Sequence, residues 1–225
     1  MENSRTPLRK WFIAIYLFAS SEDGVSAINL SHTIQVTYKT AWLMLHKLRD
    51  ALDQAECDPL LNGIVRVQGG AYGSPFNPYT EKDPQRHPLL AGGSVHDTGE
   101  VDVLRLRIID PQHVQPNGYI SHDGEQEFIK DAVSLTAAEV KSVRFRLHRS
   151  CFRPLVRCIA EFSSWANLTF HGLGRKYLQA YANEFTFRYN SRQQRQPLLA
   201  RIFQICSNQL TPTTLRSLTQ KYRIS

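Results

Sequence analysis

The hydrophobic period divides the chain into a helical start, a middle with alternating residues and a helical end. Before Pro59, apolar residues recur every three or four positions; between Val65 and Leu147, short runs alternate apolar and polar side chains; after Leu173 the longer period returns. A period near 3.6 is typical of an amphipathic helix, and a period of 2 is typical of a half-buried strand. The pattern therefore predicts an α/β protein.

The first predicted helix opens at Thr6-Pro7, runs through Leu8, Trp11 and Phe18, and stops near residues 20–24. Thr6 is the expected N-cap, and Pro7 suits the first helical position because its φ is already helical. The apolar run Trp11–Phe18 is too short to span a membrane, which takes about 18 apolar residues. No small-residue cleavage site follows it cleanly, so we interpret it as a core helix rather than a signal peptide.

Two more helices are predicted before residue 56, a short one at Ser26–Thr33 and a longer one over residues 38–52 that Thr37 can cap. The longer helix has one apolar stripe formed by Ala41, Leu45, Leu48 and Leu52. Another face carries side chains suited to DNA, namely Lys39, Trp42, His46 and Arg49. A tight turn ahead of such a helix is typical of a helix-turn-helix domain, and an ordinary three-helix bundle is the alternative.

The middle of the chain predicts a sheet with one helical crossover. The expected order is strand, strand, strand, helix, strand, and further helices follow. The strands are predicted at Val65–Gln68, Pro88–Val95, Leu104–Ile108 and Val143–Leu147, with the crossover helix at Gly124–Val133. The later helices are predicted at Leu173–Asn190 and Pro197–Ser207.

The positive charge is concentrated in the last third of the chain. The formal net charge is +7, but residues 141–225 hold fifteen Lys or Arg against two Asp or Glu, whereas residues 56–140 hold six against thirteen. Most of the excess is arginine, whose planar fork suits bidentate contact with phosphate. Double-stranded DNA is therefore the expected partner. A solvated surface that only neutralises the acidic middle is the alternative.

Composition excludes several other classes of protein. The hydrophobic fraction of 42%, with 11 Phe, 9 Tyr and 3 Trp, is unlike a disordered chain. The four cysteines form no CxxC pair and have no histidine at zinc-ligand spacing, so we expect reduced thiols and no metal site built on them. These features indicate a cytoplasmic protein without a membrane span, associated with the nucleoid if it binds DNA.

Two long blocks of the chain resemble a family of bacterial insertion-sequence DDE transposases related to the eukaryotic Merlin elements. The blocks are TPLRKWFIAIYLF with TYKTAWLMLHKLRDAL behind it, and HGLGRKYLQAYANEFTFRYNSR at 171–192. The resemblance implies a helix-turn-helix domain at 1–56, a ribonuclease-H-like core at 57–192 and a basic tail at 193–225. It also implies a homodimer or higher multimer that acts on element ends. We expect no counterpart of the family's amino-terminal zinc ribbon.

Such enzymes hold two Mg²⁺ ions with three carboxylates, and here the carboxylates depart from the family pattern. Gln68 stands where the first aspartate belongs, since the chain reads Val65-Arg66-Val67-Gln68-Gly69. The second could be Asp123, or it is lost at the end of the strand Val143–Leu147; the second alignment keeps the helical crossover, and Asp123 is then an N-cap. Glu161 lies nearest the third position.

Three hypotheses follow from this pattern. The first is a DNA-binding transposase-family protein with degenerate or lost cleavage and strand transfer. The second is an active Mg²⁺-dependent transposase whose atypical site uses Glu161, Asp123 and Glu125 or Glu127. The third is a non-functional remnant. No metal-ligand set is assigned. The residues predicted to bind DNA are Lys39, Trp42, His46, Arg49, Arg146, Arg149, His171, Arg175, Lys176, Arg188 and Arg192.

Overall fold

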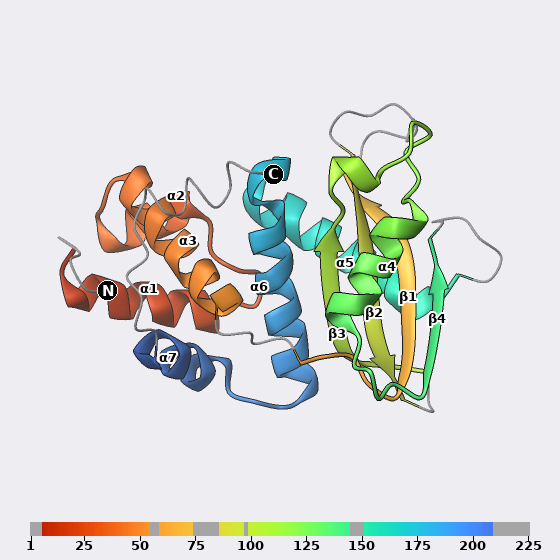
Figure 1. The fold of residues 1–225 in the computed structure, drawn as a ribbon. Coiled ribbons are helices and arrows are strands. Elements are labelled where there is room, and N and C mark those ends of the chain that lie inside the picture. Colours follow the sequence, from red (N-terminus) through yellow and green to blue (C-terminus); the bar gives the residue numbers. More distant parts are fainter. Residues whose placement is uncertain (1–5, 55–58, 74–85, 97–98, 145–150, 209–225) are drawn as a thin grey trace. The chain divides into compact units, whose positions relative to one another are not determined.

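The computed structural model describes residues 6–54, 59–73, 86–96, 99–144 and 151–208 (Figure 1). Within these residues the chain forms seven α-helices, one short 3-10 helix and four strands. The chain divides into two compact units, each with most of its contacts inside itself. We call residues 1–57 with 195–225 the helical unit, and residues 58–194 the sheet unit.

The helical unit contains α1 (Leu8–Ser20), α2 (Ala27–Ile34), α3 (Tyr38–Gln54) and α7 (Leu198–Asn208). Helices α1 and α2 both pack on α3, and α7 packs on α1 and α3. The rings of Phe12 on α1 and Phe203 on α7 lie 6.0 Å apart. The described start of the segment that we expected to be a separate tail, residues 195–208, thus belongs to the same unit as the first three helices.

The helix starts in this unit differ in how they are capped. Thr37 caps α3 as predicted, because its hydroxyl accepts a hydrogen bond from the backbone N–H of Thr40 at 3.2 Å. Thr6 does not cap α1. Helical geometry begins only at Leu8, and Pro7 is the N-cap, with an extended ψ of 140° and no side-chain cap bond. The helix therefore starts one residue later than the proline pattern predicts.

The sheet unit is built on β1 (Ile64–Tyr72), β2 (His87–Val95), β3 (Val101–Ile108) and β4 (Glu139–Val143). The strand order is β3-β2-β1-β4. Strands β1, β2 and β3 are antiparallel neighbours, and β4 runs parallel to β1. This mixed sheet confirms the predicted α/β class.

The fourth strand lies four residues earlier than we predicted. It pairs Glu139 with Ile64 and Val143 with Gln68. The crossover is short because Leu61 bonds the chain just after α4 (His122–Ala132): its N–H donates to Ala132, and its C=O accepts from Ser134. Of the predicted strand at residues 143–147, Val143 lies in β4, Arg144 lies just beyond it, and residues 145–147 lie outside the described ranges.

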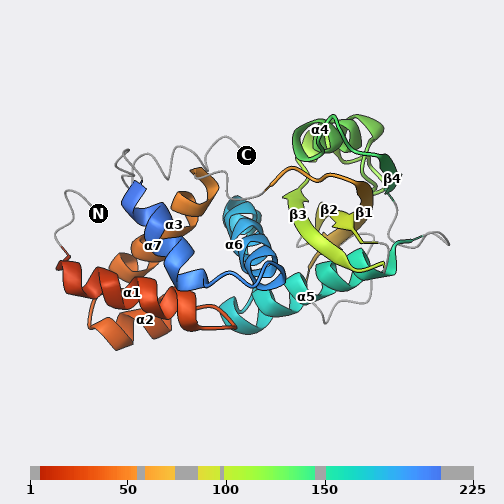
Figure 2. The same ribbon diagram turned by 90° about the horizontal axis from the view of Figure 1, so that it is seen from below.

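Helices cover both faces of the sheet. Figure 2 shows α4 on one side of the strands and α5 (Arg153–Phe170) on the other. Both helices pack closely on β2, where two adjacent glycines face opposite sides. A Cβ on Gly92 would meet Phe128 of α4 at 2.9 Å, and a Cβ on Gly93 would meet Leu155 of α5 at 3.0 Å. Helix α6 (Arg175–Gln193) packs along β3 and adds Leu178 to the α5 core.

No helix in the described ranges is both long enough and apolar enough to cross a membrane.

Candidate active site and nucleic-acid interface

The side chain of Gln68 joins three elements of the sheet unit. Its Oε1 accepts a hydrogen bond from the N–H of Phe152, the residue before α5, at 2.9 Å. Its Nε2 donates to the carbonyl oxygens of Gly69 at 3.0 Å and of Val143, the last residue of β4, at 3.4 Å. The side chain is completely buried. At the position where the resemblance places a metal-binding aspartate, the chain therefore has a neutral amide that connects β1, β4 and α5.

The two acidic candidates lie on opposite faces of the sheet. Asp123 is exposed in the first turn of α4, and Glu161 is exposed on α5 (Figure 2). Ser121, rather than Asp123, is the N-cap of α4, since its hydroxyl accepts from the N–H of Gly124 at 3.2 Å. Glu161 lies nine residues beyond Phe152, about 13 Å along the helix at 1.5 Å per residue. The structure does not bring Gln68, Asp123 and Glu161 together.

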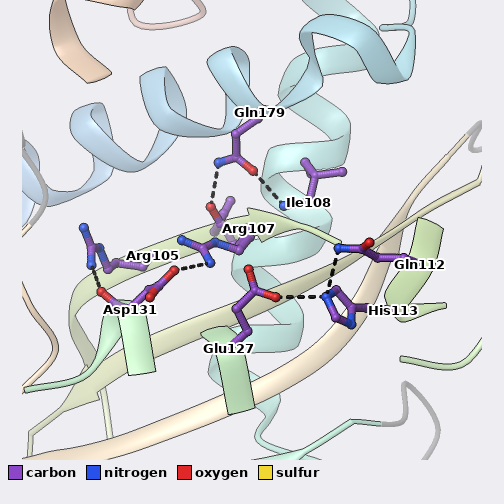
Figure 3. Close-up of polar contacts among 9 residues, drawn as sticks. Arg105, Arg107, Ile108, Gln112, His113, Glu127, Asp131 and Gln179 are labelled. Carbon is purple, nitrogen blue, oxygen red and sulfur yellow. Dashed lines mark hydrogen bonds and ion pairs between the residues drawn. The ribbon is translucent and has the colours of Figure 1, made fainter. Parts of the chain in front are cut away.

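The other carboxylates of α4 form ion pairs. Glu125 is buried, and its Oε2 lies 3.1 Å from Nε of Arg144 and 3.3 Å from Nδ1 of His122. Glu127 pairs with Nε2 of His113 at 2.9 Å, as Figure 3 shows. These contacts fasten α4 to the end of β4 and to the short helix Pro111–His113. Across the described residues, no three His, Cys, Asp or Glu side chains gather in a way that could hold a metal ion.

The block at 171–192 forms α6, and two of its amides bond the outer edge of β3. Gln179 accepts from the N–H of Ile108 at 2.8 Å and donates to the carbonyl of Leu106 at 3.0 Å (Figure 3). Asn190 accepts from the N–H of Leu104 at 2.8 Å and donates to the carbonyl of the same residue at 3.0 Å. An edge strand otherwise presents unpaired backbone groups to other chains. This part of the block therefore closes the sheet.

Two arginines predicted to bind DNA serve the packing of α6 instead of facing solvent. Arg188 donates to Oε1 of Glu184 from Nε at 3.0 Å and from its terminal nitrogen at 2.8 Å, and both side chains are buried. Arg175, half-buried, donates to the carbonyl of Ile109 at 2.7 Å. Lys176 and Arg192, also predicted to bind DNA, are exposed on the same helix.

His171 shapes the corner between α5 and α6. It is the C-cap of α5 with a left-handed φ of 58°, and its N–H donates to the carbonyl of Asn167 at 3.0 Å. Gly172 follows with a φ of 98°, which a glycine tolerates better than other residues. The His171 side chain is exposed, so the structure gives its backbone a capping role and leaves its ring accessible.

The predicted DNA-facing residues of α3 are not equally accessible. Lys39 is exposed and Trp42 is half-buried, but His46 and Arg49 are 0% and 1% exposed. The guanidinium of Arg49 lies 5.9 Å from the ring centre of Phe18 on α1. Burial, with a smaller contribution from the charge of Arg49, lowers the pKa of His46 to about 3. His46 is therefore neutral at pH 7 and offers no charge to a phosphate.

The turn between α2 and α3 is fixed by backbone and side-chain bonds. Gln35 has a left-handed φ of 52°, and the N–H of Val36 bonds back to Ser31 at 3.1 Å. Lys10 of α1 reaches the carbonyl of Gln35 with its Nζ at 2.8 Å. Three residues thus separate α2 from α3, and α1 holds the turn in place.

Four more arginines belong to the basic last third of the chain. Arg146 and Arg149, both predicted to bind DNA, lie outside the described residues. The prediction overlooked Arg153 and Arg157, which are exposed on α5. Their spacing carried the signal, because both fall opposite the apolar positions of that helix, such as Leu155 and Ile159.

No family model, curated protein or solved structure matches this chain. A function therefore has to be inferred from the residues themselves.

Proposed function

We propose that this chain is a transposase-family protein that binds duplex DNA and no longer performs the family's metal-dependent cleavage. Its sheet unit has the order β1, β2, β3, α4, β4 followed by helices. This order supports the ribonuclease-H-like core that the resemblance implies. The motif at 171–192 supports the same assignment, because it forms the helix that closes the edge of β3.

The position of Gln68 carries the proposal. Two Mg²⁺ ions in such a site are held by anionic oxygens, because a hard cation prefers carboxylate ligands. Gln68 is neutral, and its Oε1 already accepts a hydrogen bond from Phe152. An ion at this place would have to displace the amide that joins β1 to β4 and α5. The cleavage step therefore has no first ligand, while the fold around it is kept.

The helical unit supports DNA binding. Its α2, three-residue turn and α3 fit a helix-turn-helix, in which the beginning of the second helix contacts base edges in the major groove. Lys39 and Trp42 lie at that beginning of α3 and are at least partly accessible. His46 and Arg49 lie deeper along the helix and are buried, so they are better explained as parts of the packing.

Binding and cleavage are tested together on one substrate. The full chain is mixed with labelled duplexes from the two ends of the DNA segment that encodes it, with Mg²⁺ or with EDTA. We expect a retarded complex at low salt in both buffers and no strand cleavage in either. Glu161→Ala should still give a complex, and it should show no cleavage either. Mg²⁺-dependent cleavage that Glu161→Ala abolishes would establish the active-enzyme hypothesis, and the lack of any complex would favour a remnant.

A further inference from the structure

Several cations of the sheet unit are already paired with acids. Ion pairs join Arg66 to Glu139 at 2.9 Å, Arg107 to Asp131 at 2.8 Å, Arg144 to Glu125 at 3.1 Å and Arg188 to Glu184 at 2.8 Å. Figure 3 shows the pair of Arg107 and Asp131 between β3 and α4. A guanidinium that already holds a carboxylate loses that contact when it turns to a phosphate, so these residues are poor candidates for DNA contacts.

Two arginines of α5 are not among these ion pairs. Arg153 and Arg157 are exposed and form no ion pair with any residue that the structure describes. They are four residues apart on a helix, so their Cβ atoms lie about 5–6 Å from each other on one side. The opposite side of α5 packs on the sheet through Leu155, Ile159 and Phe162. The arginines therefore form an accessible cationic ridge along the outer side of the helix.

The helix on the other face of the sheet has the opposite charge. Helix α4 carries four acids and one lysine, Lys130, whereas α5 carries two arginines and one acid, Glu161. Figure 2 shows that the sheet separates the two helices. Three of the four acids of α4 already contact Arg144, His113 or Arg107, whereas the two arginines of α5 are exposed, so a polyanion that approaches the sheet unit finds accessible positive charge on the α5 side.

We propose that the ridge formed by Arg153 and Arg157 is a second DNA-contacting surface, which binds the phosphate backbone independently of α3. The inference rests on the proposed function. Duplex DNA fits the ridge because its phosphates form a dense row of charge, about one per 1.7 Å of axis, and arginine binds phosphate with two parallel hydrogen bonds. Contacts to phosphate position a protein without selecting a sequence. The ridge therefore adds affinity, and α3 adds any sequence preference.

The test compares single variants that remove an equal charge from the two faces. Arg157→Gln removes an exposed, unpaired cation from α5, and Lys130→Gln removes one from α4. Binding of the full chain to a labelled duplex of arbitrary sequence is measured by fluorescence anisotropy over a salt series. Arg153→Gln/Arg157→Gln is added as the stronger variant. Circular dichroism checks that each variant is folded, as expected for exposed positions.

The expected results are specific to the α5 side. Each arginine that contacts a phosphate contributes about 0.9 to the slope of log affinity against log salt, which amounts to about eightfold in affinity near 0.1 M salt. Arg157→Gln should lower the slope and the affinity by one such increment, and the double variant should lower them by two. Lys130→Gln should leave both unchanged. Equal effects of Arg157→Gln and Lys130→Gln would overturn the ridge and leave the proposed function intact. Wild-type protein that binds an acidic peptide but no duplex would overturn both.

Discussion

The side-chain amide of Asn190 forms both hydrogen bonds that a neighbouring strand would offer to Leu104, accepting from its N–H at 2.8 Å and donating to its carbonyl at 3.0 Å. Gln179, three helical turns earlier on α6, does the same for the N–H of Ile108 and the carbonyl of Leu106. A helix thereby replaces the missing neighbour of the edge strand β3. These two amides of the block at 171–192 therefore close the edge of the sheet.

Asn190→Asp should destabilise the sheet unit. The carboxylate can still accept from the N–H of Leu104, but it leaves the carbonyl of Leu104 without a donor and places a second oxygen against it. A buried polar group without a partner costs about 1–3 kcal/mol, and a charged one costs more. We expect urea denaturation to show a loss of about 2–4 kcal/mol. The exposed Arg192→Gln on the same helix is the control. Equal midpoints for the two variants would contradict the edge-closing role.

Gln68→Glu should make stability depend on pH. Glutamate has the same shape, but its second oxygen would face the carbonyls of Gly69 and Val143, to which the amide now donates. Arg66, two residues away, is already paired with Glu139. Burial among acceptors raises the pKa of this carboxyl, because only its protonated form can donate.

The folded variant then binds a proton that the unfolded chain releases, so its stability is highest at acid pH and falls as pH rises above about 4.3, the usual value for glutamate. Urea midpoints of Gln68→Glu and wild type, compared between acid and neutral pH, check the sign. A variant that is relatively more stable at neutral pH than at acid pH would show that the site tolerates an anion, as a metal site would.

The burial of His46 should make the stability of the helical unit fall in acid. Burial lowers the pKa of this histidine from 6.5 to about 3, so the folded chain holds it neutral while the unfolded chain protonates it. The stability that this provides is complete above pH 6.5 and declines towards pH 3 by about 1.4 kcal/mol per pH unit. His46→Gln should flatten that part of the stability profile, and the exposed His32→Gln should not. Identical acid profiles for both variants would contradict the burial of His46.

Glu161→Gln should strengthen DNA binding. Glu161 is exposed one turn beyond Arg157 on α5, so it repels any phosphate bound there. A like-charge pair about 7 Å apart in water costs about 0.6 kcal/mol, which is about threefold in affinity. An anisotropy titration at low salt measures the change, with Gln126→Glu on the opposite helix as a variant that only adds distant charge. A catalytic Glu161 would give a different result, namely loss of Mg²⁺-dependent cleavage in the Gln variant.

The hydrophobic pattern predicted the elements that carry a clear apolar stripe or alternation. The alternation at Leu104–Ile108 falls inside β3, and the apolar stripe of residues 173–190 falls on α6. Strand β4 was misplaced because it is a short edge strand whose side chains are mostly exposed, so Glu139–Val143 has no apolar alternation to show. The alternating residues at 143–147 were predicted as the strand instead, four positions closer to the C-terminus.

The role of Gln68 could not be predicted from its neighbours in the sequence. The resemblance predicts that Gln68 replaces a metal ligand, but its hydrogen-bond partner Phe152 lies 84 positions further along the chain. The same holds for Asn190 and Leu104, which are 86 positions apart. A helical period also shows which residues share a face without showing which faces another element covers. His46 and Arg49 were therefore assigned to a DNA-binding face although both are buried.

The most direct measurement is the affinity of the unmodified chain for a short labelled duplex, in EDTA, as salt is raised from about 50 mM to about 200 mM. If the chain binds DNA through its exposed cations without a metal site, binding is strong at the low end and log affinity falls linearly and steeply with log salt. No detectable binding at the lowest salt, or binding that appears only when Mg²⁺ is added, would contradict the account.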